Sequence, residues 1–210
     1  MVQTIQASVI TIDELELRFG LNEVESDQFF REWQDDLPEI TDLEKQMLDR
    51  VKAGYLNLLK NPPLLENAVR MAVLSPLLFF ADFYLYPFHI KSEKSVRISA
   101  EDQGVIVEGK IDVSVLFQQL WVMVIESKQA AFSIEAGLAQ ILAYMLANPN
   151  PEKSSFGMIT TGGSFIFVKL VKGETPQYAL SDEFVLRKRG NELYNVLSIL
   201  KRLGQLATNN

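Results

Sequence analysis

The sequence predicts a mixed α/β protein, and three features of its pattern indicate this class. Helical periodicity dominates the first third, branched and aromatic residues separated by turn residues dominate 83–128, and helices and a hairpin follow. At 210 residues, with 48% hydrophobic and 22% charged residues, the chain can bury one sizeable core. Because no repeat or linker divides it, we expect a single domain over 1–210: a helical extension (1–62), a core (63–171) and a C-terminal strand and helix (172–210).

The helical extension is expected mainly from residues 41–60. Thr41 and Glu44 have capping-box spacing, and apolar residues recur behind them at helical intervals. A Pro-Pro pair at 62–63 ends this helix. A second helix is expected from Pro63 to about Ser75-Pro76, since proline is acceptable in a first turn and disruptive further inside. Glu66 lies in the first turn of this second helix.

The core is expected to contain a strand meander followed by a helix and a hairpin. The composition predicts strands over 83–90, 95–100, 105–117 and 120–128. A helix is predicted over 133–147, and a hairpin over 156–161 and 164–171, closed by Gly162-Gly163. A closing helix is predicted over 192–206.

Charge is unevenly distributed along the chain. The net charge is -7, and residues 1–66 hold fourteen acids against six bases. The C-terminal part has basic residues at Arg187, Lys188, Arg189, Lys201 and Arg202. This basic segment could meet phosphate, or it could be a solvated helix face. The overall acidity argues against tight, non-specific binding to nucleic acid.

Composition also limits the chemistry and the location. The chain has no cysteine and one histidine, His89, which excludes thiolate chemistry and His-rich metal clusters and makes a Ser-His-Asp triad improbable. Carboxylates, lysines and amides must therefore carry any reaction. No basic segment followed by a long apolar stretch opens the sequence, so we expect a cytoplasmic protein. The most apolar window, 71–90, is interrupted by Pro76 and Asp82 and is expected to be core rather than membrane.

Two acids are expected to face each other across a hairpin. Residues 107–115 alternate, which predicts the odd-numbered residues on one face and Asp112 on the other. A tight turn at 118–120 places Asp112 opposite Glu126, at the end of an apolar run typical of a buried strand. Like charges so placed destabilise a sheet unless a cation or proton intervenes, and a hard divalent cation is the natural partner. Lys128 points into the same space and could hold a water or neutralise phosphate charge.

This pattern, Ile111-Asp112 and then Glu126-Ser127-Lys128 after thirteen residues, resembles the PD-(D/E)XK nuclease superfamily and its restriction-endonuclease-like fold. The resemblance implies a mixed central sheet flanked by helices, here with the acidic helical N-terminal extension. It also implies a Mg²⁺-dependent phosphodiesterase acting on DNA, with Mn²⁺ as a substitute. The family's proline before the first acid is Ile111 here.

The resemblance extends to two helices and covers roughly residues 63–171. In that family a helix bearing an acid precedes the sheet, a position that Glu66 matches, and Gln140 with Tyr144 match the Gln-x-x-x-Tyr motif of the exonuclease-related branch. By resemblance, Asp112 and Glu126 are metal ligands together with the Ser127 carbonyl, and Glu66 is an accessory contact. Lys128 is then the catalytic base or positions the water, and Gln140 with Tyr144 supports the site.

Each of these residues also has a simpler reading. Asp112 and Glu126 could be solvent-facing acids balanced by lysines, and Glu66 a helix-first-turn acid. Gln140 and Tyr144 could be a helix-packing pair, and Glu108-Gly109-Lys110 repeats the acid-x-Lys triplet as a decoy. Three functional hypotheses follow: a nuclease, alone or as a homodimer; a catalytically silent binding or assembly module using its acidic helices; and a subunit of a larger DNA-processing complex.

Overall fold

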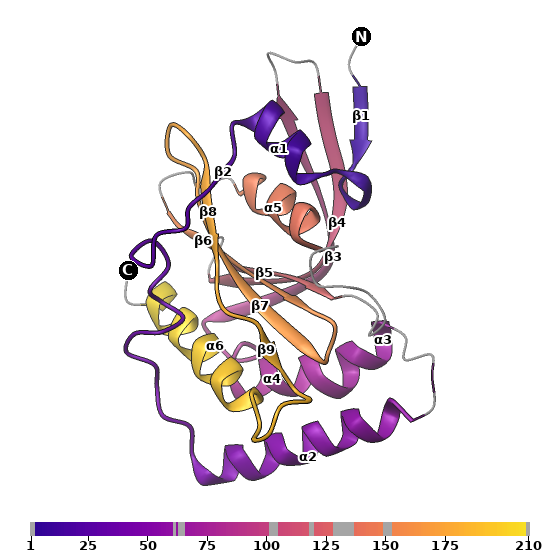
Figure 1. Cartoon of the computed structure of the whole chain (residues 1–210), viewed down its shortest axis with the longest axis vertical. Helices are drawn as coiled ribbons and strands as arrows, with labels where there is room; N and C mark the ends of the chain where they lie inside the picture. Colours follow the sequence, from indigo (N-terminus) through magenta and orange to yellow (C-terminus); the bar gives the residue numbers. More distant parts are fainter. Residues whose placement is uncertain are drawn as a thin grey trace.

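The computed structural model describes residues 3–60, 62, 66–100, 105–117, 120–127, 137–148 and 153–208. For residues 93–94, 96, 99–100, 105 and 120–127 it describes the backbone alone. In this part of the chain, helices and strands combine in a mixed α/β arrangement, which confirms the predicted class (Figure 1).

The strands of the described residues form one mixed sheet. They are β1 (Gln3–Gln6), β2 (Asn22–Glu23), β3 (Phe88–Ala100), β4 (Val105–Phe117), β5 (Leu120–Ser127), β6 (Ser155–Thr160), β7 (Ser164–Val171), β8 (Gln177–Leu180) and β9 (Phe184–Val185). The path of the sheet is β1-β4-β5-β6-β7-β8-β2, with β3 beside β4 and β9 beside β7. The pairs β1–β4, β5–β6 and β2–β8 are parallel.

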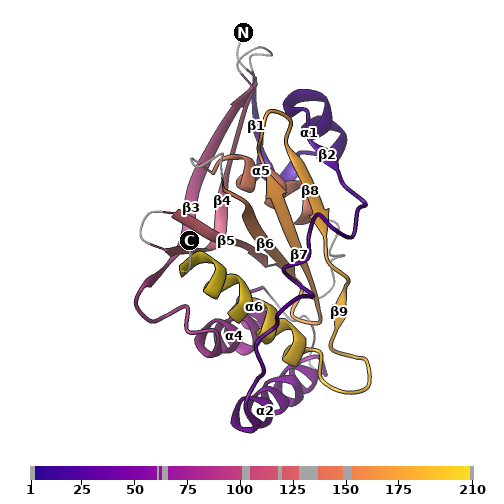
Figure 2. The ribbon, with the colours of Figure 1, turned by 90° about the vertical axis from the view of Figure 1, so that its left-hand side faces the viewer.

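Helices cover both faces of this sheet (Figures 1 and 2). They are η1 (Ala7–Val9), α1 (Ile12–Phe19), α2 (Asp42–Leu58), α3 (Glu66–Val69), η2 (Arg70–Leu74), α4 (Ser75–Phe80), α5 (Leu138–Leu146) and α6 (Leu193–Thr208). One core lies under α2, α4 and α6, and the other lies under α5 and α1. Adjacent residues Met158 and Ile159 of β6 belong to different cores, as the two-residue period of a strand requires.

The N-terminal third differs from the expected helical extension. The capping box is confirmed, because the Glu44 N–H donates to Thr41 Oγ1 at 3.2 Å and Glu44 Oε2 accepts from the Thr41 N–H at 2.7 Å. However, β1 joins the sheet beside β4, and β2 joins it beside β8. These strands are too short for an alternating hydrophobic pattern to be seen in the sequence, because their extended structure depends on pairing with a longer strand.

The second predicted helix does not end at Ser75-Pro76. Its predicted start at Pro63 lies outside the described residues, and from Glu66 it continues through α3, η2 and α4 to Phe80. The turn η2 is π-helical, with the Ser75 N–H bonded to the Arg70 carbonyl five residues back. Pro76 therefore stands in the first turn of α4, where its missing N–H costs little.

The meander is confirmed in β4 and corrected at its start. Strand β3 begins at Phe88, so the strand predicted over 83–90 is wrong for 83–87, where the chain turns. Phe83 is fully buried and meets the Phe88 ring edge-on, with 5.1 Å between centroids. Its aromatic character therefore reflects burial rather than strand structure.

The single apolar face predicted along Val107–Val115 is interrupted. Ile111 packs in the α5-side core, whereas Val113 packs in the opposite core. The ladder with β3 keeps one register across this point, with Lys94 opposite Ile111 and Ser92 opposite Val113. The change therefore involves no inserted residue, and Asp112 lies between these two positions. Figure 2 shows β3 and β4 as long, curved strands.

The rest of the chain follows the predictions closely. The hairpin β6–β7 and the closing helix α6 are confirmed, and α5 falls within the predicted 133–147, of which 133–136 lie outside the described residues. On α6, Arg202 pairs with Asp36 at 3.1 Å and Lys201 with Glu44. These two cations of the basic segment therefore bind the acidic N-terminal region. Among the described residues, none of the helices combines the length and apolarity needed to cross a membrane.

We predict that Gly109→Ala destabilises the protein by about 1–3 kcal/mol, the usual range for overpacking a core. A Cβ on Gly109 would lie 2.7 Å from both Ala7 Cβ and Tyr144 Cε1. Thermal unfolding followed by circular dichroism measures the effect. Gly54→Ala is the control, because a Cβ at this α2 position meets nothing within 4 Å and should stabilise by up to about 1 kcal/mol. Equal midpoints for the two variants would contradict the packing described.

Candidate functional site

Strand β4 changes partners along one of its edges, and the candidate site lies at this change. Residues 105–108 pair with β1, and residues 113–117 pair with β5. In the described ladders, Gly109, Lys110 and Ile111 pair with β3 alone. Asp112 therefore lies between the part of β4 that pairs with β1 and the part that pairs with β5.

The hairpin register agrees with the arrangement predicted from the sequence. Val113 pairs with Ile125, Ser114 with Val124 and Val115 with Met123, before a bulge shifts the pairing nearer the turn. The next residues beyond Val113 and Ile125 are Asp112 and Glu126. In an antiparallel ladder these two positions are opposite one another.

Arg70 brings Glu66 and Asp112 together. Its Nη2 atom lies 2.6 Å from Asp112 Oδ1 and also contacts Glu66 Oε1. Glu66 and Arg70 are four residues apart on one helix face, and Arg70 opens the π-helical turn. Turns of this kind often occur at functional sites. Two acids from a helix and a strand thus converge on one cationic group.

This cluster is partly buried and incompletely hydrogen-bonded. The side chains of Asp112 and Arg70 are 16% and 22% exposed, and that of Glu66 is 36% exposed. Among the described residues, Arg70 Nε is buried and has no hydrogen-bond partner. Nη2 therefore serves two carboxylates, in place of the two-pronged pairing that makes arginine bridges strong. Arg70 acts here mainly as a positive charge.

The other predicted residues have different positions. Glu126 and Ser127 pair with Ile159 and Thr160 of β6, so the backbone of this acid lies at the end of a central strand, as predicted. The structure describes their backbone only, and Lys128 lies outside the described residues. Within the described residues, no cluster of three or more His, Asp or Glu side chains suited to a metal is present.

Gln140 and Tyr144 form a buried pair on α5. Gln140 Nε2 donates to the Tyr144 hydroxyl at 2.6 Å. Gln140 is 8% exposed and Tyr144 is 1% exposed. The Tyr144 ring packs against Gly109, three positions before Asp112 on β4. This placement supports the packing interpretation of the pair, which would act on the site by fixing β4.

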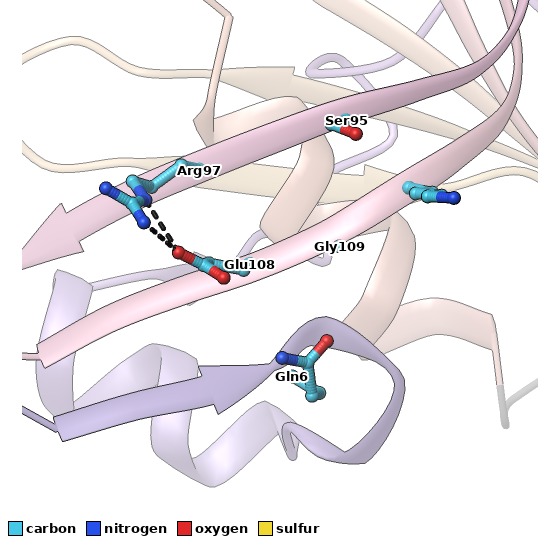
Figure 3. Close-up of a pocket in the computed structure, with 6 residues that line it drawn as sticks. Gln6, Ser95, Arg97, Glu108 and Gly109 are labelled. Carbon is cyan, nitrogen blue, oxygen red and sulfur yellow. Dashed lines mark hydrogen bonds and ion pairs between the residues drawn. The ribbon is translucent and has the colours of Figure 1, made fainter.

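The decoy triplet Glu108-Gly109-Lys110 lines a separate hollow of ≈ 510 Å³ between β1, β3 and β4 (Figure 3). There the Glu108 carboxylate accepts a hydrogen bond from Arg97 Nε at 2.8 Å. Its charge is therefore balanced by a neighbouring strand, which supports treating the triplet as a decoy.

Sequence reasoning missed Arg70. The available signal was its spacing from Glu66, four residues along a helix, which commonly produces an ion pair. The contact with Asp112 joins residues 42 positions apart and depends on the fold. A scan against protein-family models finds no match to this chain, and a search of curated proteins finds none.

Proposed function

We propose that this chain is a metal-dependent nuclease that hydrolyses phosphodiester bonds of DNA on a restriction-endonuclease-like fold. The observation that carries the proposal is the convergence of Glu66 and Asp112 on one cation, with Glu126 one ladder step beyond the last described pair. Two acids that share one cation, with a third acid at the end of the neighbouring strand, are a donor set suited to metal-assisted phosphodiester hydrolysis.

The donor set fits a hard divalent cation such as Mg²⁺ or Mn²⁺. Carboxylate oxygens are the ligands such ions prefer, and the two described carboxylates already share one positive group. Asp112 and Glu126, with the Ser127 carbonyl and Glu66, would hold the ion. When bound, it supplies a polarised water and stabilises charge on the phosphate.

The chain's own residues have distinct roles in this proposal. Asp112 and Glu126 would hold the ion from adjacent strands, whose pairing keeps the two backbone positions together. Lys128, two residues after Glu126, holds the attacking water or neutralises developing charge on the phosphate. Gln140 and Tyr144 keep β4 in place through the contact with Gly109. Arg70 keeps the two acids together, and a bound ion would compete with it for Asp112.

The proposal is tested by calorimetric titration with Mn²⁺ and Mg²⁺. The unmodified chain is expected to bind, and Asp112→Asn and Glu126→Gln should each weaken binding at least tenfold, as the loss of a ligand would. Glu108→Gln is the matched control, because it removes an acid from the same strand without touching the cluster. Unchanged affinity in Asp112→Asn, or an equal loss in the control, would refute the assignment.

The rival function is a binding or assembly module, alone or as a subunit, in which Arg70 permanently neutralises the acids. The contact between Arg70 and both carboxylates favours it. Its proposed acidic surface is reduced, however, since Glu32, Asp36 and Glu44 pair with cations of the same chain. Absence of binding heat with either metal ion selects this rival.

A further inference from the structure

A basic groove lies between α2 and the segment that follows β9. It has a volume of ≈ 600 Å³ and is lined by Lys52, Leu56, Leu59, Lys60, Leu186, Arg187 and Lys188. All of these residues lie outside the range 63–171 that carries the nuclease resemblance. Three of the seven are leucines, which are buried or half-buried, and the other four are cations.

Cations in the groove and next to it carry positive charge that ion pairs within the described part of the chain do not balance. Among the described residues, Lys60, Arg187, Lys188 and Arg189 make no ion pair, and all four are exposed. Lys169, Lys201 and Arg202 are in contrast paired with acids of the N-terminal region. The excess charge at the groove is therefore local, although the whole chain is acidic.

Hydrogen bonds of the backbone hold residues 186–190 in a fixed conformation. Lys52 Nζ donates to the Lys188 carbonyl at 3.1 Å and also to the Gly190 carbonyl. The Leu186 N–H donates to the Gly163 carbonyl at 2.9 Å. Because these bonds use the backbone, they leave the Arg187 and Lys188 side chains to a ligand. A preformed site avoids part of the ordering cost of binding.

The same contacts connect the groove with the candidate site. Gly163 belongs to the β6–β7 turn, which packs on Tyr55 of α2 and on Val69, the residue before Arg70. Burial raises the pKa of the Tyr55 phenol, and the charge of nearby Arg187 opposes this rise. One turn thus contacts Leu186 of the groove and Val69, the chain neighbour of Arg70.

We infer that the basic groove binds the phosphodiester backbone of the nucleic acid that the candidate site cleaves, an inference that rests on the proposed function. Unpaired, preformed cations are suited to phosphates, which fix the register of a strand without reading its sequence. The net negative charge of the whole chain disfavours binding of this backbone elsewhere, which makes the local cations of the groove its favoured contact.

The test is the anisotropy of a fluorescent DNA duplex titrated with the full chain at several salt concentrations, in EDTA. Arg187→Glu/Lys188→Glu should lower affinity at least about tenfold and reduce the salt slope by about 2, one for each phosphate contact. Lys45→Glu/Arg50→Glu is the matched control. It makes the same charge change on α2 outside the groove, and its affinity for DNA should stay within about twofold of that of the unmodified chain.

Three results would overturn the inference. They are unchanged binding by the groove variant, equal weakening by the control, and competition by polyglutamate as strong, per charge, as by unlabelled DNA. Competition by polyglutamate would instead indicate that the groove binds an acidic protein. The binding test in EDTA is independent of metal. If the groove binds DNA but calorimetry detects no Mn²⁺ binding, the groove remains a DNA-binding site and the proposed nuclease is wrong. If calorimetry detects Mn²⁺ binding but DNA binding does not depend on the groove, the nuclease proposal stands and the groove inference is wrong.

Discussion

Asp112→Asn is expected to lower Mg²⁺-dependent cleavage of DNA by about 10³-fold or more. Losing an acid that holds the metal removes several kcal/mol of charge stabilisation, and each 1.36 kcal/mol changes the rate tenfold. Asparagine keeps the size of the side chain, and Glu66 still pairs with Arg70, so the fold should survive. Release of labelled fragments from plasmid and single-stranded substrates measures the rate.

Glu108→Gln is the control for this experiment. Glu108 lies on the same strand, carries the same charge and pairs with Arg97 rather than Arg70. Its cleavage rate should therefore match that of the unmodified chain, and both variants should show unfolding midpoints near the original. Cleavage by purified Asp112→Asn at the unmodified rate would remove this acid from the reaction and with it the proposed nuclease.

The sequence was most informative where a local rule determines the structure. The β4–β5 register follows from two strands and a short turn, and the observed pairs Val113–Ile125 and Val115–Met123 match the expected alignment. The Thr41 cap likewise depends on residues three apart. Both features could be predicted because the interacting groups are close along the chain.

Features created by distant contacts were not predictable in the same way. The four residues of β1 become a strand by pairing with β4, a hundred positions later. The π-helical turn at Arg70 allows the helix to pass Pro76, which a rule based on proline alone does not anticipate. Arg70 was missed for a similar reason, since its meaning depends on Asp112 being folded next to it.

Arg70→Met is expected to destabilise the chain by about 1.5–3 kcal/mol in the absence of divalent metal, the range for hydrogen bonds to charged groups. Methionine fills a similar volume without charge, so the Glu66 and Asp112 carboxylates would lose the cation that they share. Denaturant unfolding in EDTA measures the loss. Arg70→Lys retains the positive charge and should lose less, and Asp112→Asn should relieve part of the loss when combined with Arg70→Met.

Added Mn²⁺ then distinguishes the two functions. If Arg70 occupies the place of a metal, Arg70→Met should bind Mn²⁺ more tightly than the unmodified chain, because no guanidinium has to leave, and Mn²⁺ should restore its stability. If Arg70 permanently closes the cluster, Mn²⁺ should leave both the affinity and the unfolding midpoint of Arg70→Met unchanged. An unchanged affinity and midpoint would mean that Glu66 and Asp112 only stabilise the fold. A divalent ion that prefers carboxylate ligands would then be unable to replace the Arg70 guanidinium.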